Sequence, residues 1–161
     1  MLIAGLMPSA ASFADRIRLG IPLAIMTTLA AWAAYSSSSL VGLREGYWAA
    51  ISAIIVMQSQ VSSTRNAGRI RFLGTAIGAV IGWLCASYWH HHVGIYAAAV
   101  GLTVVICCLL NMADAGCPAA VALTVIVLIP RAEPIWRIAL LRFLEVSWGI
   151  ALAIAVQSVA R

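Results

Sequence analysis

Residues 65–83 read RNAGRIRFLGTAIGAVIGW, and this stretch decides how the rest of the chain is interpreted. Three arginines come before an uncharged run in which Gly74, Gly78 and Gly82 recur every four residues. Residues four apart lie on one face of a helix, so the glycines form a smooth strip. Inside a membrane, small residues at this spacing let two helix backbones approach closely. The stretch therefore predicts a transmembrane helix with arginines at its entrance and a packing seam along Gly74, Gly78 and Gly82.

The composition indicates an integral membrane protein. Of the 161 residues, 63% are hydrophobic and only 9% are charged, whereas soluble domains carry about 25% charged residues. The formal charge of +5 comes from arginines scattered singly between apolar runs. They form no basic stripe, so we expect contact with a lipid bilayer and no binding of nucleic acid.

The apolar runs predict an all-α membrane protein with six transmembrane helices in a single module. The last helix has to begin near Trp136, because uncharged residues 146–160 would give only about 22 Å of helix across a hydrocarbon core of about 30 Å. This start draws Arg142 and Glu145 into the membrane. The predicted spans are about 19–35, 47–60, 72–89, 93–110, 117–130 and 136–158.

An even number of spans places both termini on one side of the membrane, and that side also carries more of the arginines. The positive-inside rule then predicts cytoplasmic N- and C-termini for a multi-pass protein of a bacterial inner (plasma) membrane.

An internal repeat is visible at a shift of 71 residues. It aligns residues 71–73 with residues 142–144, both reading RFL, and Gly78 with Gly149. Each half then holds three spans, so the second half must enter the membrane from the opposite side. This pattern predicts a 3+3 inverted repeat, although a chance match between apolar segments remains the alternative. The second and fifth spans are the shortest, and short spans at matching positions point to a substrate site.

Arg142 and Glu145 are the first candidates for function. Charge within the hydrocarbon is costly, about 2.5–3.5 kcal/mol for an arginine near a helix centre. The two residues are three apart and can pair on one helix face. Two interpretations stay open. The pair is self-neutralised near the interface, or Arg142 binds an anion in a water-filled cavity while Glu145 tunes it or carries a proton.

Five further residues are candidates for an anion path. Arg65, Arg69 and Arg71 are either a topology anchor or a vestibule that concentrates anions, because a cleft of one charge sign focuses the field. Gln58 and Gln60 end a short span, where they either line the same path or cap the helix at the interface.

No metal, cofactor or enzymatic chemistry is expected. The consecutive histidines 90–92 point in different directions, so they do not form a chelate by themselves. The cysteines lack CxxC spacing and are interpreted as small core residues; they are Cys85, Cys107, Cys108 and Cys117. We find no catalytic triad, paired carboxylates or phosphate-binding loop.

Three segments carry a resemblance to a known family. They are YWAA at 47–50, VMQ at 56–58 and RFLGT at 71–75 followed by Gly78-Ala79. Together they resemble the signature of fusaric acid resistance-like proteins, also called aromatic acid exporters. Plant aluminium-activated malate transporters look like distant relatives. By position, Arg71, Gly74, Thr75 and Gly78 match the motif.

The resemblance implies a six-helix module that moves organic or aromatic carboxylates along a path lined by basic residues. Long members add a cytosolic domain and often a second membrane module, so this shorter chain is expected to assemble as a homodimer or a larger ring. The leading hypothesis is a homo-oligomeric transporter or channel for organic anions. The alternative is a non-transporting membrane subunit or scaffold that binds a partner protein through its glycine-rich helix.

Overall fold

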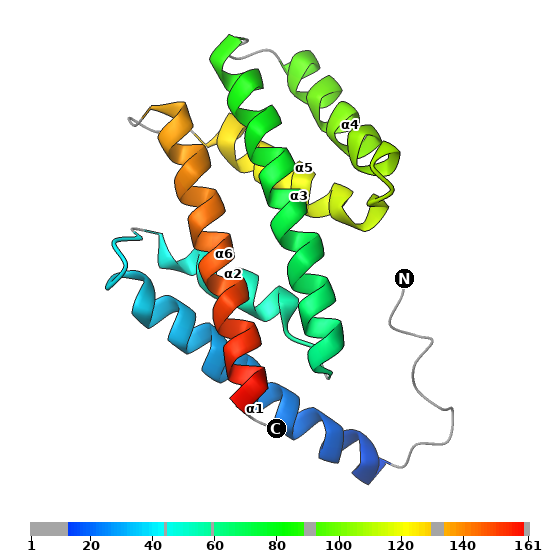
Figure 1. Cartoon of the computed structure of the whole chain (residues 1–161), viewed down its shortest axis with the longest axis vertical. Coiled ribbons are helices and arrows are strands. Elements are labelled where there is room, and N and C mark those ends of the chain that lie inside the picture. The colour runs from blue at the N-terminus through cyan, green and yellow to red at the C-terminus, as the bar shows by residue number, and fades with distance from the viewer. Residues whose placement is uncertain (1–12, 44, 59, 89–92, 130–133, 160–161) are drawn as a thin grey trace.

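The structure, a computed structural model, describes residues 13–43, 45–58, 60–88, 93–129 and 134–159 (Figure 1). Within these ranges all regular secondary structure is helical, which confirms the all-α fold class. The elements are α1 (Phe13–Ser38), α2 (Gly46–Val56), α3 (Val61–Tyr88), α4 (Val93–Leu109), the 3₁₀ turn η1 (Ala113–Ala115), α5 (Gly116–Leu128) and α6 (Ile135–Val159).

Two long helices form the centre of the molecule. α3 and α6 run side by side in opposite directions (Figure 1). With 28 and 25 residues, they are about 42 and 37 Å long at the helical rise of about 1.5 Å per residue. In the described part of the chain, these two helices are long and apolar enough to cross a membrane.

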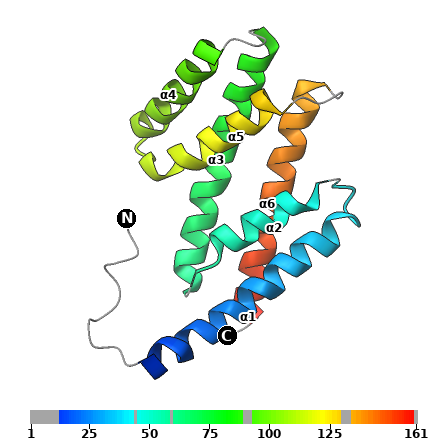
Figure 2. The same cartoon turned by 180° about the vertical axis from the view of Figure 1, so that it is seen from behind.

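The two shortest α-helices lie across the central pair. Figure 2 shows α2 and α5 against the face of α3 and α6 that is turned away in Figure 1. α2 has 11 residues and packs mainly against α6, whereas α5 has 13 residues and packs mainly against α3. α1 covers α2 and α6 at one end of the molecule, and α4 covers α5 and α3 at the other.

Glycines set the distance between the helix backbones at both crossings, where α5 crosses α3 and where α2 crosses α6. Gly74, Gly78 and Gly82 of α3 all face α5, and at Gly78 a β-carbon would lie 2.8 Å from the carbonyl carbon of Ala119. At the other crossing, a β-carbon on Gly149 of α6 would lie 2.9 Å from the carbonyl carbon of Ala49 in α2. The backbones therefore touch directly, with no side chain between them.

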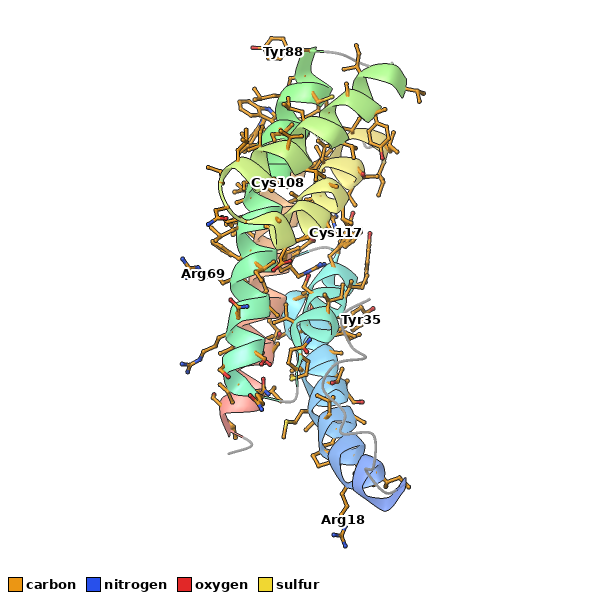
Figure 3. The ribbon with its side chains drawn as sticks, turned by 90° about the vertical axis from the view of Figure 1, so that its right-hand side faces the viewer. Arg18, Tyr35, Arg69, Tyr88, Cys108 and Cys117 are labelled. Atoms are coloured by element: carbon orange, nitrogen blue, oxygen red, sulfur yellow. The ribbon has the colours of Figure 1, made fainter. Side chains whose placement is uncertain are left out.

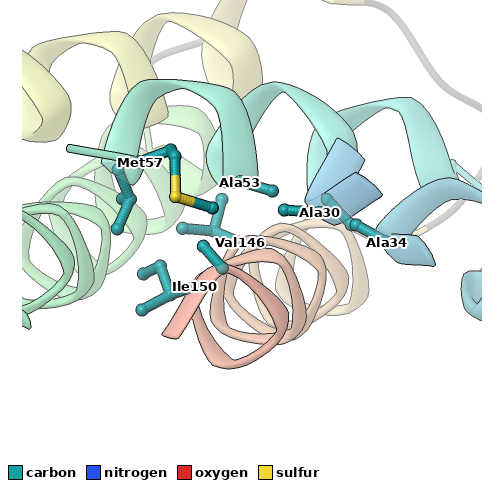
Figure 4. Packing of buried hydrophobic residues seen from close by; sticks show 9 residues of the cluster. Ala30, Ala34, Ala53, Met57, Val146 and Ile150 are labelled. Carbon is teal, nitrogen blue, oxygen red and sulfur yellow. The ribbon is translucent and has the colours of Figure 1, made fainter. Parts of the chain in front are cut away.

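Small residues also build the largest core, where α1, α2 and α6 meet (Figure 4). Ala30 and Ala34 of α1 are fully buried against Ala53 of α2 and Ile150 of α6. The indole nitrogen of Trp148 donates a hydrogen bond of 2.9 Å to the Ser37 hydroxyl, which ties α6 to α1. Because alanines fill this space, the three helices approach closely over much of their length.

The outer surface is strongly apolar. A row of large apolar residues on α1 recurs at helical spacing, and its members are about half exposed. Large apolar residues are also exposed on each of the remaining α-helices. The row on α1 consists of Ile17, Ile21, Ile25, Leu29 and Trp32. Contiguous exposed apolar surface of this extent is typical of contact with lipid or with another protein.

Helix boundaries differ from the predicted spans in three places. α1 (Phe13–Ser38) extends past both ends of the predicted span 19–35. α3 begins at Val61, so Arg65, Arg69 and Arg71 lie inside the helix instead of at its entrance, because the polar residues 62–66 continue the helical turn. α2 ends at Val56, which leaves Gln58 and Gln60 outside the helix. The predicted histidine segment 90–92 lies outside the described residues.

We predict that Gly78→Ala and Gly149→Ala each destabilise the protein by about 1–3 kcal/mol, the usual cost of overpacking. In both cases the new methyl group would overlap a backbone carbonyl that cannot rotate away. Thermal unfolding of the purified protein, followed by circular dichroism, measures the effect.

Gly101→Ala is the matched control, because Gly101 is exposed within α4 and a β-carbon there meets nothing within 4 Å. This substitution should raise stability slightly, by about 0.5–1 kcal/mol, through helix propensity. Equal stability in all three variants would show that the crossings tolerate separation.

Candidate functional site

A buried ion cluster lies where α6 meets the start of α2. The Arg142 side chain is only 4% exposed, and its Nη1 lies 3.0 Å from Oε2 of Glu145, which is 1% exposed. The two residues are three apart on α6, as the sequence predicts. The Nη2 of Arg142 also forms an ion pair with Oε2 of Glu45. One guanidinium is therefore shared by two carboxylates.

Glu45, which contributes to this cluster, is the residue just before α2. Its backbone N–H donates a hydrogen bond of 3.1 Å to Oε1 of Glu145, and its Oε2 accepts one of 2.5 Å from the Tyr47 hydroxyl. The side chain of Glu45 is 23% exposed, so it is the most accessible of the three charged groups. These contacts join the beginning of α2 to the middle of α6.

Trp48 covers the guanidinium from one side. The Arg142 Cζ lies 4.9 Å from the Trp48 ring centroid, a cation–π arrangement that stabilises a desolvated cation. Trp48 follows Glu45 by three residues, so the N-cap residue and the first turn of α2 together present both side chains to Arg142. The Trp48 Nε1 and the Arg142 Nε are buried and have no hydrogen-bond partner among the described residues.

A second arginine reaches the same place from α3. Arg71 and Arg142 both line a small cavity of about 20 Å³ where α2, α3, α5 and α6 come together. Arg71 donates from Nε to the Ser52 hydroxyl at 3.3 Å, and among the described residues no carboxylate pairs with it. The cavity is also lined by Trp48, Thr75, Pro118, Val121, Ala122, Val125 and Val146.

This geometry favours an acceptor group as ligand. A cavity of about 20 Å³ holds roughly one water molecule. Arg71, Arg142 and Trp48 line it mainly through apolar surface. The Trp48 Nε1 and the Arg142 Nε are buried and lack acceptors. Buried donors without acceptors are costly, and a carboxylate oxygen or a water would satisfy them. Among the described residues, no group of three acidic, histidine or cysteine side chains gathers in a way that would hold a metal ion.

The remaining predicted site residues lie elsewhere. Arg65 and Arg69 are exposed on α3, and Figure 3 shows Arg69 pointing away from the helix bundle. Gln58 and Gln60 are also exposed, beyond the end of α2 and away from its first turn. Gln58 takes part through its backbone, because its carbonyl accepts a hydrogen bond of 2.6 Å from the Gln157 amide. The structure thus brings together Arg142, Glu145 and Arg71 and leaves the other four apart.

Sequence reasoning missed Glu45 and Ser52 and used Trp48 only as part of the YWAA segment at 47–50 that carries the family resemblance. The available signal was the i, i+3 spacing of Glu45 and Trp48 at the start of a short helix. That signal is weak, because Glu45 and Arg142 are separated by 97 residues in the chain.

A helical bundle with an apolar exterior and charged residues paired in its interior is the arrangement expected of a membrane protein whose buried charges serve a function. The chain belongs to the fusaric acid resistance protein-like family, whose model matches residues 29–156. The match includes every residue of the ion cluster and confirms the resemblance drawn from the motifs. It identifies a membrane protein. Comparisons with curated proteins and with solved structures gave no significant match. The likeness to plant malate transporters stays a prediction.

We predict that Arg142→Gln lowers the free energy of unfolding by about 3–5 kcal/mol, because breaking a buried ion pair leaves its carboxylate partners uncompensated. The double variant Arg142→Gln with Glu145→Gln should lose less than the sum of the two single variants, because it removes one of those carboxylates. Thermal unfolding of all four proteins gives the coupling energy.

Arg69→Gln is the control for removing an exposed arginine and should change stability by no more than about 0.5 kcal/mol. Strict additivity of the two single variants would mean that the pair contributes nothing to the fold.

Proposed function

We propose that this protein moves organic anions, either aromatic acids or other carboxylates, across a membrane as a transporter or channel. The observation that carries the proposal is the placement of Arg142 and Arg71, from the two long helices, on one buried cavity. Arginine forms bidentate hydrogen bonds with carboxylates, and hydrogen-bond donors without acceptors lie beside it. Membership of the fusaric acid resistance protein-like family supports an organic acid as the substrate.

A 3+3 inverted repeat is part of the proposal. The helix pairs that touch support it, because α2 packs on α6 as α5 packs on α3. Within these pairs Gly149 meets the Ala49 carbonyl, and Gly78 meets the Ala119 carbonyl. α1–α2 and α4–α5 also match, as do α1–α6 and α4–α3. In this scheme α2 and α5, with 11 and 13 residues, are short spans that do not reach across the hydrocarbon core by themselves, and the substrate site lies at the interface between the two halves.

The proposed setting is a bacterial inner membrane, with both termini in the cytoplasm and several copies assembled together. Exposed Arg65 and Arg69 support the cytoplasmic assignment of the start of α3, because arginines collect on that side. A cavity of about 20 Å³ is far smaller than an organic acid. A conducting path therefore needs a change of conformation or a contribution from the surface between copies.

The alternative is a scaffold that binds a partner through the glycine-rich helix. Gly74, Gly78 and Gly82 already pack against α5 of the same chain, so a partner would need a different surface. This contact favours transport over the scaffold.

The test is anion flux in proteoliposomes that contain only this protein, with benzoate and a dicarboxylate as probes. We expect benzoate flux from the wild type. The double variant Arg142→Gln with Glu145→Gln should lose at least about 90% of it, because the guanidinium that binds the carboxylate is gone while the buried charge stays nearly balanced. The single variant Glu145→Gln removes only the carboxylate. Comparing its flux with that of the double variant shows how much of the loss comes from the arginine.

Arg69→Gln is the transport control and should retain flux, because Arg69 points away from the bundle. Flux that needs a pH gradient would identify a proton-coupled exporter, whereas flux that follows the membrane potential would identify a channel. Absence of flux from folded wild-type protein under both conditions would favour the scaffold.

A further inference from the structure

Arg142 holds two carboxylates that differ in how firmly they are fixed. Glu145 is 1% exposed, sits on the same helix as Arg142 and accepts a hydrogen bond from the Glu45 backbone. Glu45 is 23% exposed and precedes the first turn of α2. It follows a connection in which Gly42 has a φ of +76°, a conformation that L side chains rarely adopt. Glu45 is therefore the more accessible of the two carboxylates on Arg142.

We propose that an aromatic monocarboxylate binds this protein by replacing the Glu45 carboxylate on Arg142. This inference rests on the proposed function and specifies how the substrate is recognised. Glu45 is then a specificity-determining residue, because its own carboxylate occupies the position that the carboxylate of the substrate requires. Glu145 stays on Arg142 throughout and keeps the guanidinium oriented.

The available space supports replacement over simple addition. The cavity beside Arg142 has a volume of about 20 Å³ and holds no more than a water-sized group. A carboxylate does not fit there, so the contact that Glu45 makes with Arg142 is the one an incoming carboxylate can take over. Departure of the Glu45 side chain frees the Nη2 of Arg142, the donor that Glu45 engages.

The surrounding side chains favour an aromatic ring on the ligand. Tyr47 touches the Glu45 carboxylate through its hydroxyl, and its ring lies 5.6 Å from that of Trp48, centroid to centroid. Tyr47 is 45% exposed, so its ring borders the open side of the cluster. A carboxylate placed on Arg142 brings its attached ring to this pair, where aromatic rings gain offset or tilted contacts.

The experiment measures binding of radiolabelled benzoate to the full chain in lipid nanodiscs. Glu45→Gln should bind benzoate about tenfold more tightly than the wild type, because it removes the competing charge-assisted contact. The variant should fold, since Arg142 keeps the Glu145 carboxylate. Tyr47→Phe removes only the hydroxyl that holds Glu45 in place, and it should tighten binding by about two- to threefold.

Asp114→Asn is the matched control. It also removes one negative charge, but Asp114 is exposed in η1 and does not line the cavity. Its affinity for benzoate should equal that of the wild type. This comparison separates local competition on Arg142 from a change in overall charge.

The outcomes separate the two proposals. Tighter binding by Glu45→Gln and Tyr47→Phe, but not by Asp114→Asn, supports replacement. If the wild type binds benzoate and both variants bind it equally well or more weakly, replacement is overturned and the anion-transport proposal stands. Equal tightening in Asp114→Asn overturns it as well, because the effect would then be one of net charge. If neither the wild type nor any variant binds benzoate, the binding of aromatic acids itself fails.

Discussion

The buried guanidinium of Arg142 imposes the strongest constraint on this structure. An arginine inside an apolar bundle is costly unless its charge is paired nearby. Glu145 supplies one partner from the same helix, but Glu45 and Trp48 have to come from elsewhere. The start of α2 is therefore held at one position along α6. Helix packing alone would allow α2 to slide, whereas the ion cluster fixes its register.

The close crossings make this fixed register possible. At Gly149 the backbone of α2 rests directly on α6, and the Arg142 cluster lies two turns away along the same helix. A bulkier residue at 149 would lift α2 away from α6 and draw Glu45 and Trp48 from the guanidinium. At the second crossing, Gly78 fixes α5 against α3 near Arg71. The glycine contacts and the charged site therefore form one structural unit, because the geometry of each depends on the other.

The sequence predicted the parts of this arrangement that are local in the chain. The helical class, the glycine face of α3 and the pairing of Arg142 with Glu145 all follow from spacings of three or four residues. The role of Glu45 could not be predicted from such spacings, because it depends on α2 packing beside α6. Glu45 and Arg142 are 97 residues apart in the chain. The start of α3 was also misplaced. Residues 62–66 are polar and give no hydropathy signal, although they continue the helix that carries the glycines.

The same constraints indicate which part of the site is least restrained. Separating α2 from α6, or α5 from α3, would break direct backbone contacts along whole helix faces. Turning the Glu45 side chain breaks contacts that include its ion pair with Arg142 and its hydrogen bond from Tyr47, and it leaves the helix crossings intact. The Glu45 backbone N–H can stay on Glu145 during that movement, so the end of α2 keeps its anchor. A side-chain exchange at Arg142 therefore leaves both helix crossings in place.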